Sequence, residues 1–225
     1  MCAWPRAEPE LTMTMKREVE IKLRVEDLTG LLDKLRGLGA ECKGSVYEEN
    51  TLYDTSTREF QQMQAILRIR RERRARKPNT PRSRGRHAKG GRGLITYKEM
   101  VSGKLGRGGA KYKVREEIEY HIKNARRIEK LFVRLGLRAW FRYEKYRTRY
   151  RLEKFPELYL DLDETPIGTF LELEGSKRAI DGAARALGYD EEDYLAASYL
   201  ELYSRKCERR GTKTGNMVFK RKNNG

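Results

Sequence analysis

The chain has 225 residues, and its 50 Lys and Arg residues against 33 Asp and Glu residues give a formal net charge of +17. This length is enough for one large domain with a sizeable core. The mean hydropathy is −0.86, and no apolar stretch approaches the roughly 20 residues that a membrane-spanning helix needs. The composition therefore excludes a helical membrane protein.

The N-terminal region and the cysteines indicate the compartment. Residues 1–15 contain no charged segment followed by an apolar run, so we expect no secretory signal and interpret them as a disordered tail. Cys2, Cys42 and Cys207 are scattered and odd in number, which fits neither a disulfide framework nor a Cys-x-x-Cys metal knuckle. A reducing, cytoplasmic location is expected.

Almost all of the excess positive charge lies in two segments. Residues 74–92 carry eight Lys or Arg and no acid, and residues 205–225 carry eight and one acid, so they contribute +15 of the +17. Both segments are poor in large apolar residues, which is typical of chains that cannot bury enough surface to become ordered. We interpret 74–92 as a flexible basic loop and 205–225 as a disordered basic tail. Nucleic acid could be a partner only through these two segments.

The apolar pattern predicts a strand and then a helix at the start of the domain. Residues 18–24 (EVEIKLR) alternate strictly between polar and apolar, which predicts a strand. Residues 26–38 have apolar residues at helical spacing with Gly39 directly after them, which predicts a helix with a glycine stop. Further strands are predicted at residues 46–54, 65–73, 94–101 and 111–122.

In the second half of the chain, helices and strands are predicted to alternate. Residues 138–152 are rich in aromatic residues, and we expect two strands around a turn near 142–145. The other predicted elements are helices at 124–135, 177–187 and 191–204 and strands at 158–163 and 169–174. The sequence therefore predicts an α+β fold with roughly eight or more strands, which form a single antiparallel β-barrel-like sheet with helices packed on its outside.

The polar faces of the predicted strands carry charged residues almost exclusively. In residues 67–70, for example, Arg68 and Arg70 share one face while Leu67 and Ile69 share the other. One such strand would favour a surface sheet with weak cross-strand ion pairs, but seven favour a barrel with a charged interior. The repeated cations are Lys22, Arg68, Arg70, Lys98, Arg115, Lys145 and Arg147, and the carboxylates are Glu18, Glu20, Glu117, Glu119, Asp161, Asp163, Glu172 and Glu174.

These two sets of charges indicate what the interior would bind. Arginine and lysine side chains suit the oxygens of a polyphosphate. The carboxylates would repel that polyphosphate unless a divalent cation lay between them, and all-oxygen ligands favour Mg²⁺ or Mn²⁺. The two histidines, His87 and His121, lie in the basic loop and at a strand end, which argues against a zinc site.

Glu18, Glu20 and Lys22 form an E-x-E-x-K pattern that resembles the signature of the CYTH superfamily, also called triphosphate tunnel metalloenzymes. The pattern alone is short, but further motifs follow it in order, so the resemblance covers roughly residues 16–204. These motifs are NTLYDT (50–55), LRIR (67–70), LITYK (94–98), REEIE (115–119), EKYR (144–147), LD (162–163) and GTFLELE (168–174). The resemblance implies an eight-stranded tunnel that binds a triphosphate and a divalent metal.

The resemblance also implies a role for each matching position. The metal-binding carboxylates would be Glu18, Glu20, Asp163, Glu172 and Glu174. The phosphate-binding side chains would be Lys22, Arg68, Arg70, Lys98, Arg115, Lys145 and Arg147, and Lys22, Arg68, Arg70, Lys98 and Arg147 would also act in catalysis. The long basic loop and the basic tail depart from compact members of the superfamily, but neither contains a motif position.

Such a tunnel is compatible with three functions, which the sequence leaves open. The leading prediction is hydrolysis of the terminal phosphate of inorganic triphosphate, thiamine triphosphate or ATP. If the ribose 3′-hydroxyl attacks the α-phosphorus instead, the chain is an adenylyl cyclase of the class IV type that releases pyrophosphate. The third is a non-catalytic module that binds polyphosphate or an RNA 5′-triphosphate end. Whether the chain is a monomer or a homodimer also stays open.

Overall fold

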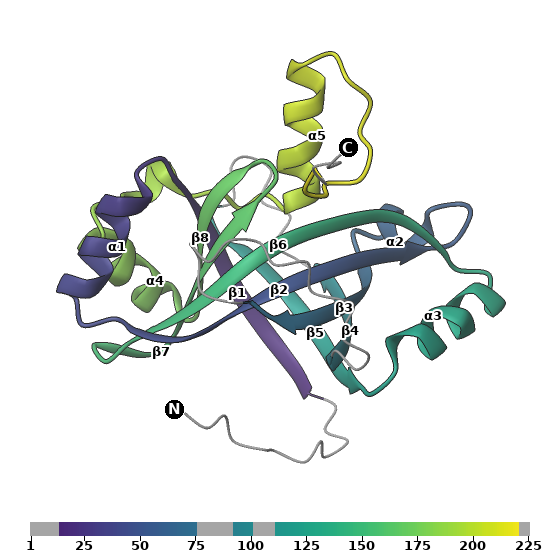
Figure 1. Cartoon of the computed structure of the whole chain (residues 1–225), viewed down its shortest axis with the longest axis horizontal. Helices are drawn as coiled ribbons and strands as arrows, with labels where there is room; N and C mark the ends of the chain where they lie inside the picture. The colour runs from purple at the N-terminus through teal and green to yellow at the C-terminus, as the bar shows by residue number, and fades with distance from the viewer. Residues whose placement is uncertain (1–13, 76–91, 101–110, 221–225) are drawn as a thin grey trace, which may run out of the picture.

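The computed structural model describes residues 14–75, 92–100 and 111–220. In these ranges eight strands form one closed antiparallel barrel in the order β1-β5-β4-β3-β2-β6-β7-β8, with five α-helices around it (Figure 1), which confirms the predicted fold class. The strands are β1 (Thr14–Val25), β2 (Glu41–Asp54), β3 (Ile66–Arg74), β4 (Arg92–Met100), β5 (Lys113–Ile122), β6 (Arg138–Leu152), β7 (Phe155–Thr165) and β8 (Gly168–Glu174). The helices are α1 (Leu28–Gly37), α2 (Glu59–Gln62), α3 (Ala125–Arg134), α4 (Lys177–Ala186) and α5 (Tyr199–Arg209), with a 3₁₀ turn at Glu191–Asp193.

The barrel closes because β1 pairs with both β5 and β8. Glu18 lies opposite Arg115 of β5, and Lys22 lies opposite Glu172 of β8. Each of these pairs joins an acid to a base on the same face of the sheet, and opposite charges at directly opposed positions stabilise an antiparallel pair. The register therefore brings charged side chains from distant parts of the sequence together inside the barrel.

The apolar side of the strands faces the helices. Ile21 and Leu23 of β1 and Leu160 of β7 pack with Leu35 of α1 and Ile180 of α4, and all five side chains are buried. α3 packs in the same way on the outward side of β3 and β4. Because successive residues of a strand point to opposite faces, burying this side turns the charged side inward.

The barrel has two ends, which different elements surround. The α5 end is where β1 and β2 end and β6 and β8 begin, and α5 stands over it in Figure 1. The far end is where β1 begins and β8 ends.

One long strand replaces a predicted pair. The expectation of two strands around a turn near residues 142–145 is wrong, because β6 runs without interruption from Arg138 to Leu152. Its pairing with β2 continues through the supposed turn, with Arg142 opposite Thr51 and Lys145 opposite Glu48. The charged residues that suggested a turn are instead alternating inward and outward positions of a barrel strand.

The predicted helix at 191–204 is also wrong in its extent. After the 3₁₀ turn the chain is extended, and the Leu195 backbone exchanges two hydrogen bonds with Lys22 of β1, at 3.0 and 2.8 Å. α5 begins at Tyr199 because Ser198 and Glu201 form a capping box, in which the Ser198 hydroxyl accepts from the Glu201 amide and the Glu201 carboxylate accepts from the Ser198 amide. The backbone therefore reaches the α5 end of the barrel before the helix starts.

The interpretation of 205–225 as a disordered tail is wrong for residues 205–220. α5 continues to Arg209, and Gly211 follows in the left-handed region at φ 64°. The chain then returns to β6, where the Met217 amide donates to the Arg142 carbonyl at 2.9 Å and the Glu144 amide donates to the Met217 carbonyl at 3.0 Å. These hydrogen bonds form beside a stretch of β6 that extends beyond its partner β7, so the segment finds free backbone groups there.

Some predicted segments lie outside the described residues. They are residues 76–91 of the basic loop, residues 221–225 of the tail and residues 1–13 of the N-terminal tail, whereas Thr14 and Met15 belong to β1. Among the helices that the structure describes, none is long and apolar enough to cross a membrane.

Candidate functional site

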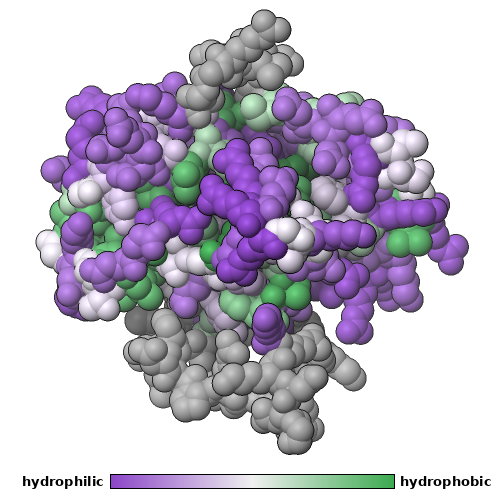
Figure 2. Space-filling model, turned by 90° about the horizontal axis from the view of Figure 1, so that it is seen from above, coloured by the Kyte–Doolittle hydropathy of each residue, from purple (hydrophilic) through white to green (hydrophobic). Residues whose placement is uncertain are grey.

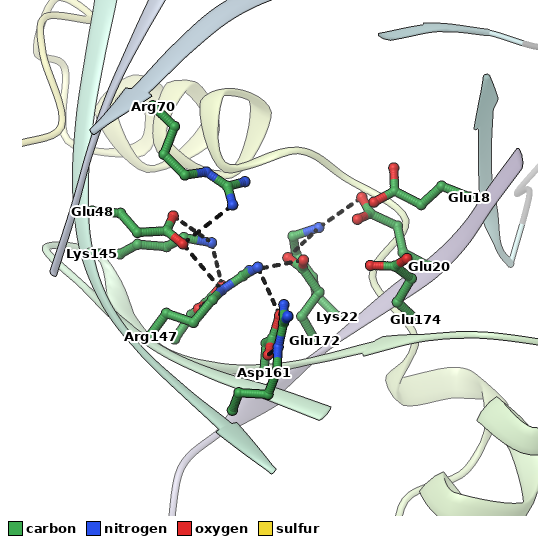
Figure 3. Close-up of polar contacts among 12 residues, drawn as sticks. Glu18, Glu20, Lys22, Glu48, Arg70, Lys145, Arg147, Asp161, Glu172 and Glu174 are labelled. Carbon is green, nitrogen blue, oxygen red and sulfur yellow. Dashed lines mark hydrogen bonds and ion pairs between the residues drawn. The ribbon is translucent and has the colours of Figure 1, made fainter. Parts of the chain in front are cut away.

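The interior of the barrel is the candidate site, and Figure 3 shows its central ion pairs. Every charged residue that the sequence placed on an inward face lies on the predicted strand. Most of them are buried, including Glu18, Glu20, Lys22, Arg68, Arg115, Glu117, Lys145, Arg147, Asp161, Asp163 and Glu172. Buried charges need partners, and here the partners come from other strands of the same barrel.

Arg147 of β6 lies at the centre of the densest cluster. Its Nε and Nη2 atoms donate to Asp163 at 2.7 and 2.6 Å, Nη2 also reaches Glu172 at 2.9 Å, and Nη1 lies 2.8 Å from Asp161. Although burial opposes the charge, Asp161, Asp163 and Glu172 hold the pKa of Arg147 well above its ordinary value. The guanidinium is therefore fixed in charge and in orientation.

Lys22 of β1 joins this cluster to the next. Its Nζ atom lies 3.1 Å from Glu20 and 3.2 Å from Glu172. Burial lowers the pKa of Lys22, but Glu172 and Glu20 raise it by more, so it lies above its ordinary value. Burial raises the pKa of Glu20, but Lys113 and Lys22 lower it by more, so it lies below its ordinary value. Both groups are thus held ionised in the interior.

The cations of β3, β4 and β5 form a second group. Lys98 Nζ donates to Glu18 at 2.6 Å and lies 3.0 Å from Glu117. Arg68 donates from Nη1 to the Tyr143 hydroxyl at 3.2 Å and from Nη2 to the Thr96 hydroxyl at 3.0 Å.

Several arginine N–H donors on β3 and β5 lack a hydrogen-bond partner among the described residues. Within the part of the chain that the structure describes, six buried arginine donor atoms find no hydrogen-bond partner, and four of them belong to inward-facing residues of the barrel: Nε of Arg68, Nε of Arg70, and Nε and Nη1 of Arg115. Burial also lowers the pKa of Arg115 despite the raising effects of Glu20 and Glu18. Buried unpaired donors are costly, so this part of the interior is suited to an anion.

The five predicted metal ligands do not converge on one point. Glu18, Glu20 and Glu174 lie together on neighbouring strands, with Glu20 opposite Glu174, whereas Glu172 lies beyond Lys22 near Arg147 (Figure 3). Asp163 accepts hydrogen bonds from Lys145 and Arg147 of β6. In the described ranges no group of three or more His, Cys, Asp or Glu side chains is close enough to hold a metal ion as it stands.

The Glu18, Glu20 and Glu174 group nevertheless has the character of a cation site. Burial raises the pKa of Glu174, and the nearby Glu18 raises it further, against the lowering effect of Lys16. Glu174 and Glu18 are thus two partly or fully buried carboxylates that repel each other. Carboxylate oxygens are the ligands that Mg²⁺ and Mn²⁺ prefer.

Several interior residues were not predicted from the sequence, among them Glu48, Tyr143, Tyr199 and Lys113. Glu48 of β2 is buried and lies 3.5 Å from Arg70 and 3.6 Å from Lys145. Tyr143 shares the inward face of β6, and Tyr199 of α5 donates from its hydroxyl to Asp163 at 2.6 Å. Glu48 lies two residues before Asn50 in a strand without strict alternation, and Tyr199 is the first residue of a helix, where strand alternation gives no signal.

Comparisons with known proteins agree with this geometry. The CYTH domain model matches residues 16–199. A Methanocaldococcus jannaschii protein named "Putative adenylate cyclase MJ0240" is 28% identical over 195 residues, which cover 82% of this chain and 97% of that protein. The solved structure of the PH1819 protein from Pyrococcus horikoshii OT3 is 28% identical, with a TM-score of 0.61 over 84% of this chain and 99% of that one.

A more distant structure shares the fold alone. HpAC1 from Hippeastrum, named a "putative adenylyl cyclase" and described as having a dominant triphosphatase activity, is 18% identical with a TM-score of 0.51. The match covers 88% of this chain and 97% of that one. All the inward-facing charged residues from Glu18 to Glu174 lie within the part of the chain that the CYTH domain model matches. The chain therefore belongs to the CYTH domain family.

Proposed function

We propose that the chain is a metal-dependent enzyme that binds a triphosphate inside the barrel and hydrolyses its terminal phosphate. The observation that carries the proposal is the set of buried arginine donors without partners, on Arg68, Arg70 and Arg115. Phosphate oxygens are the ligands that arginine recognises best. The substrates we propose are inorganic triphosphate, thiamine triphosphate and ATP.

The cations of the barrel would bind and orient the triphosphate. Lys22, Lys145 and Arg147 surround one region of the interior, and Arg68 with Lys98 lies across from it. Fixed positive charges around a transferring phosphoryl group stabilise the charge of the transition state without reorganising during the reaction. Because hydrogen bonds to Asp163 hold Lys145 and Arg147 in place, these two side chains would lose little ordering entropy when the substrate binds.

The metal we propose is Mg²⁺ or Mn²⁺, held by Glu18, Glu20 and Glu174. A divalent cation there would neutralise phosphate charge and polarise the phosphoryl oxygens. For these carboxylates to act as ligands, the Lys16 ammonium would leave Glu174, the Lys98 ammonium would leave Glu18, and the Lys113 and Lys22 ammonium groups would leave Glu20. Those lysines would then be free to pair with phosphate oxygens, so the acids and the bases of the interior each gain a new partner.

A second candidate is the adenylyl cyclase reaction. The relative that is 28% identical carries an adenylate cyclase name, and the same cage of charges would serve attack by the ribose 3′-hydroxyl on the α-phosphorus. The third candidate, a binding module without turnover, would hold polyphosphate or an RNA 5′-triphosphate end. It predicts strongly salt-dependent binding that is lost when the basic segments 74–92 and 205–225 are removed.

One assay separates the three candidates. The protein is incubated with inorganic triphosphate, thiamine triphosphate or ATP and with Mg²⁺ or Mn²⁺, and phosphate, pyrophosphate and cyclic AMP are measured. Phosphate release supports hydrolysis, whereas cyclic AMP with pyrophosphate supports cyclisation. Tight binding without either product supports the binding module.

Two variants and one control locate the activity. Arg68→Ala and Glu18→Gln should each lower kcat/KM by about 100-fold or more, as expected when one charge-stabilising group is removed from an active site. Arg71→Ala is the matched control, because Arg71 lies on the same strand but faces outward to Glu129 of α3. Equal activity of Arg68→Ala and Arg71→Ala would refute the placement of the site in the barrel.

A further inference from the structure

Three large apolar side chains are exposed at the C-terminal end of α3. Leu131 is 48% exposed, Val133 is 63% exposed and Leu135, the C-cap residue, is 67% exposed. Leu131 and Leu135 are neighbours on the helix surface, because residues four apart share one side of a helix. The other exposed large apolar side chains of the described residues lie in three separate segments: Leu38, Met63 and Val218. Single exposed apolar residues are ordinary, whereas a group of them indicates a surface that contacts a partner.

The packing of α3 on the barrel does not use these three side chains. The inward side of the helix is formed by Ala125, Ile128 and Phe132, whose spacing places them on one side of a helix. They pack in one cluster with Ile69 of β3 and Tyr53 of β2. The exposed apolar residues at the end of α3 are therefore additional to the contacts that hold the helix in place.

Basic side chains form most of the remaining outer surface of α3. Residues 123–138 contain one acid, Glu129, and it forms an ion pair with Arg71 of β3. The six cations of this range all belong to exposed residues, and none of them has an ion-pair partner in the part of the chain that the structure describes: Lys123, Arg126, Arg127, Lys130, Arg134 and Arg138. We call these six cations together with Leu131, Val133 and Leu135 the α3 surface.

The α3 surface lies at one end of the molecule. Figure 1 shows α3 at one end of the long axis and α1 and α4 at the other. Seen from above in Figure 2, the described surface at the α3 end is mostly hydrophilic, with a small hydrophobic group among the hydrophilic residues. A surface at the end of the long axis can contact a broad, flat partner without interference from the rest of the barrel.

The charge of the α3 surface argues against a second copy of this chain as the partner. In a two-fold symmetric contact the same surface faces itself. The six cations of one copy would then lie against the six cations of the other, and like charges across an interface oppose association. The partner is therefore expected to be anionic.

The apolar residues argue against nucleic acid. Nucleic acid would match the positive charge, but its phosphate backbone offers no apolar surface to cover Leu131 and Leu135. Bases would stack on exposed aromatic rings, whereas the aromatic residue of α3, Phe132, is turned inward, with its ring 5.2 Å from that of Tyr53. A partner that is both anionic and apolar at its surface fits better.

We propose that the α3 surface binds the surface of an anionic lipid bilayer. Lysine and arginine side chains are attracted to anionic lipid head groups, and apolar side chains beside them enter the boundary between head groups and acyl chains. α3 has ten residues, about half of the roughly 20 that a spanning helix needs, so the contact is with the membrane surface. Because all of these side chains lie outside the barrel, the proposal does not depend on triphosphate binding.

The first test is co-sedimentation of the full chain with vesicles at physiological ionic strength. One set of vesicles contains phosphatidylserine and phosphatidylcholine, and the other contains phosphatidylcholine alone. Each Lys or Arg near an anionic membrane strengthens binding by about fivefold, so we expect the first set to bind at least about tenfold more tightly. Absence of binding, or equal binding to both sets, would overturn the proposal.

A pair of charge-reversal variants locates the binding on α3. Lys130→Glu combined with Arg134→Glu should weaken binding to the anionic vesicles by at least about tenfold. The matched control is Arg178→Glu combined with Arg185→Glu on α4, another ten-residue helix, because Arg178 and Arg185 are also exposed and Arg185 also lies in a last helical turn. Equal binding by the two double variants would show that α3 is not the contact.

A pair of leucine variants tests the apolar part of the surface. Leu135→Gln should weaken vesicle binding several-fold. Leu38→Gln is the matched control, because Leu38 is the C-cap residue of the ten-residue helix α1 and is also exposed. Thermal unfolding shows whether each variant folds, and Val133→Gln replaces Leu135→Gln if the latter does not.

Two further measurements decide against the other partners. The first is binding of the same variants to a DNA duplex. If the α3 charge variant loses DNA and vesicle binding equally while Leu135→Gln binds vesicles as the wild type does, the surface recognises polyanions in general and the proposal is overturned. The second is analytical ultracentrifugation. A wild-type dimer that Leu135→Gln dissociates would assign the surface to a second copy of the chain and would also overturn the proposal.

Discussion

Replacing Glu48 by glutamine tests how strongly the fold depends on the charge balance inside the barrel. The Glu48 carboxylate is 1% exposed and lies 3.5 Å from Arg70, 3.6 Å from Lys145 and 3.9 Å from Arg147. Arg70, Lys145 and Arg147 lower its pKa below the ordinary value although burial raises it. At pH 7 the native state therefore contains an ionised carboxylate that offsets part of the positive charge of three buried cations.

The expected loss of stability follows from these contacts. Charge pairs at such distances are worth about 4 kcal/mol each at an effective dielectric constant of about 20, but the desolvation of the carboxylate offsets much of this. Arg147 and Lys145 keep Asp163 as a partner, so Arg70 loses most. We expect a net loss of about 3 kcal/mol, which lowers the Tm of a domain of this size by about 6–12 °C.

The assay is thermal unfolding at pH 7 with and without inorganic triphosphate. Glu49→Gln is the matched control, because the neighbouring Glu49 faces outward and forms a surface ion pair with Arg73 at 3.3 Å. Loss of such a pair lowers the free energy of unfolding by about 1 kcal/mol or less. Triphosphate should stabilise Glu48→Gln at least as much as the wild type, since it brings new negative charge to the same cations. Equal Tm values for Glu48→Gln and Glu49→Gln would refute the reasoning.

Two further predictions concern single groups of the network. Burial lowers the pKa of Lys113 to about 8, although Glu20 raises it. Between pH 8 and 10.5 the unfolded chain therefore binds more protons than the folded one, so the free energy of unfolding should rise with pH in that window. Lys113→Met should flatten this rise in a series of thermal melts. Tyr199→Phe removes the hydrogen bond to Asp163 but keeps the ring, so it should cost about 1.5–3 kcal/mol in urea unfolding. An unchanged free energy of unfolding would show that this hydrogen bond does not stabilise the fold.

The charged interior could be predicted from the sequence because alternation is a local property of each strand. The inward positions of β3, with Arg68 and Arg70 between Leu67 and Ile69, are visible in four consecutive residues. The apolar outer positions repeat in the same way in β7 and β8. Where each strand carries its own signal, no knowledge of its partners is needed.

The α5 end could not be predicted because its order depends on contacts between distant segments. The residues around Met217 are polar and basic, with no periodic pattern, and they become ordered only because β6 offers free backbone groups beside Arg142 and Glu144. Glu48 was missed for a related reason, since Glu49 beside it is also acidic and the strand gives no clear choice of inward face. Neither contact can be seen within a short window of sequence.

The pairing of β1 with β8 also affects how the chain reaches its native state. Glu20 lies opposite Glu174, and more than half of the sequence separates these two residues. The barrel can therefore close only after β8 has formed, and topologies with such distant pairings fold slowly. Before the barrel closes, the inward faces of the strands expose lysine, arginine, aspartate and glutamate side chains instead of apolar ones. Charged side chains on unpaired strands oppose association with other chains. The residues suited to binding a substrate would therefore also protect the partly folded protein from aggregation.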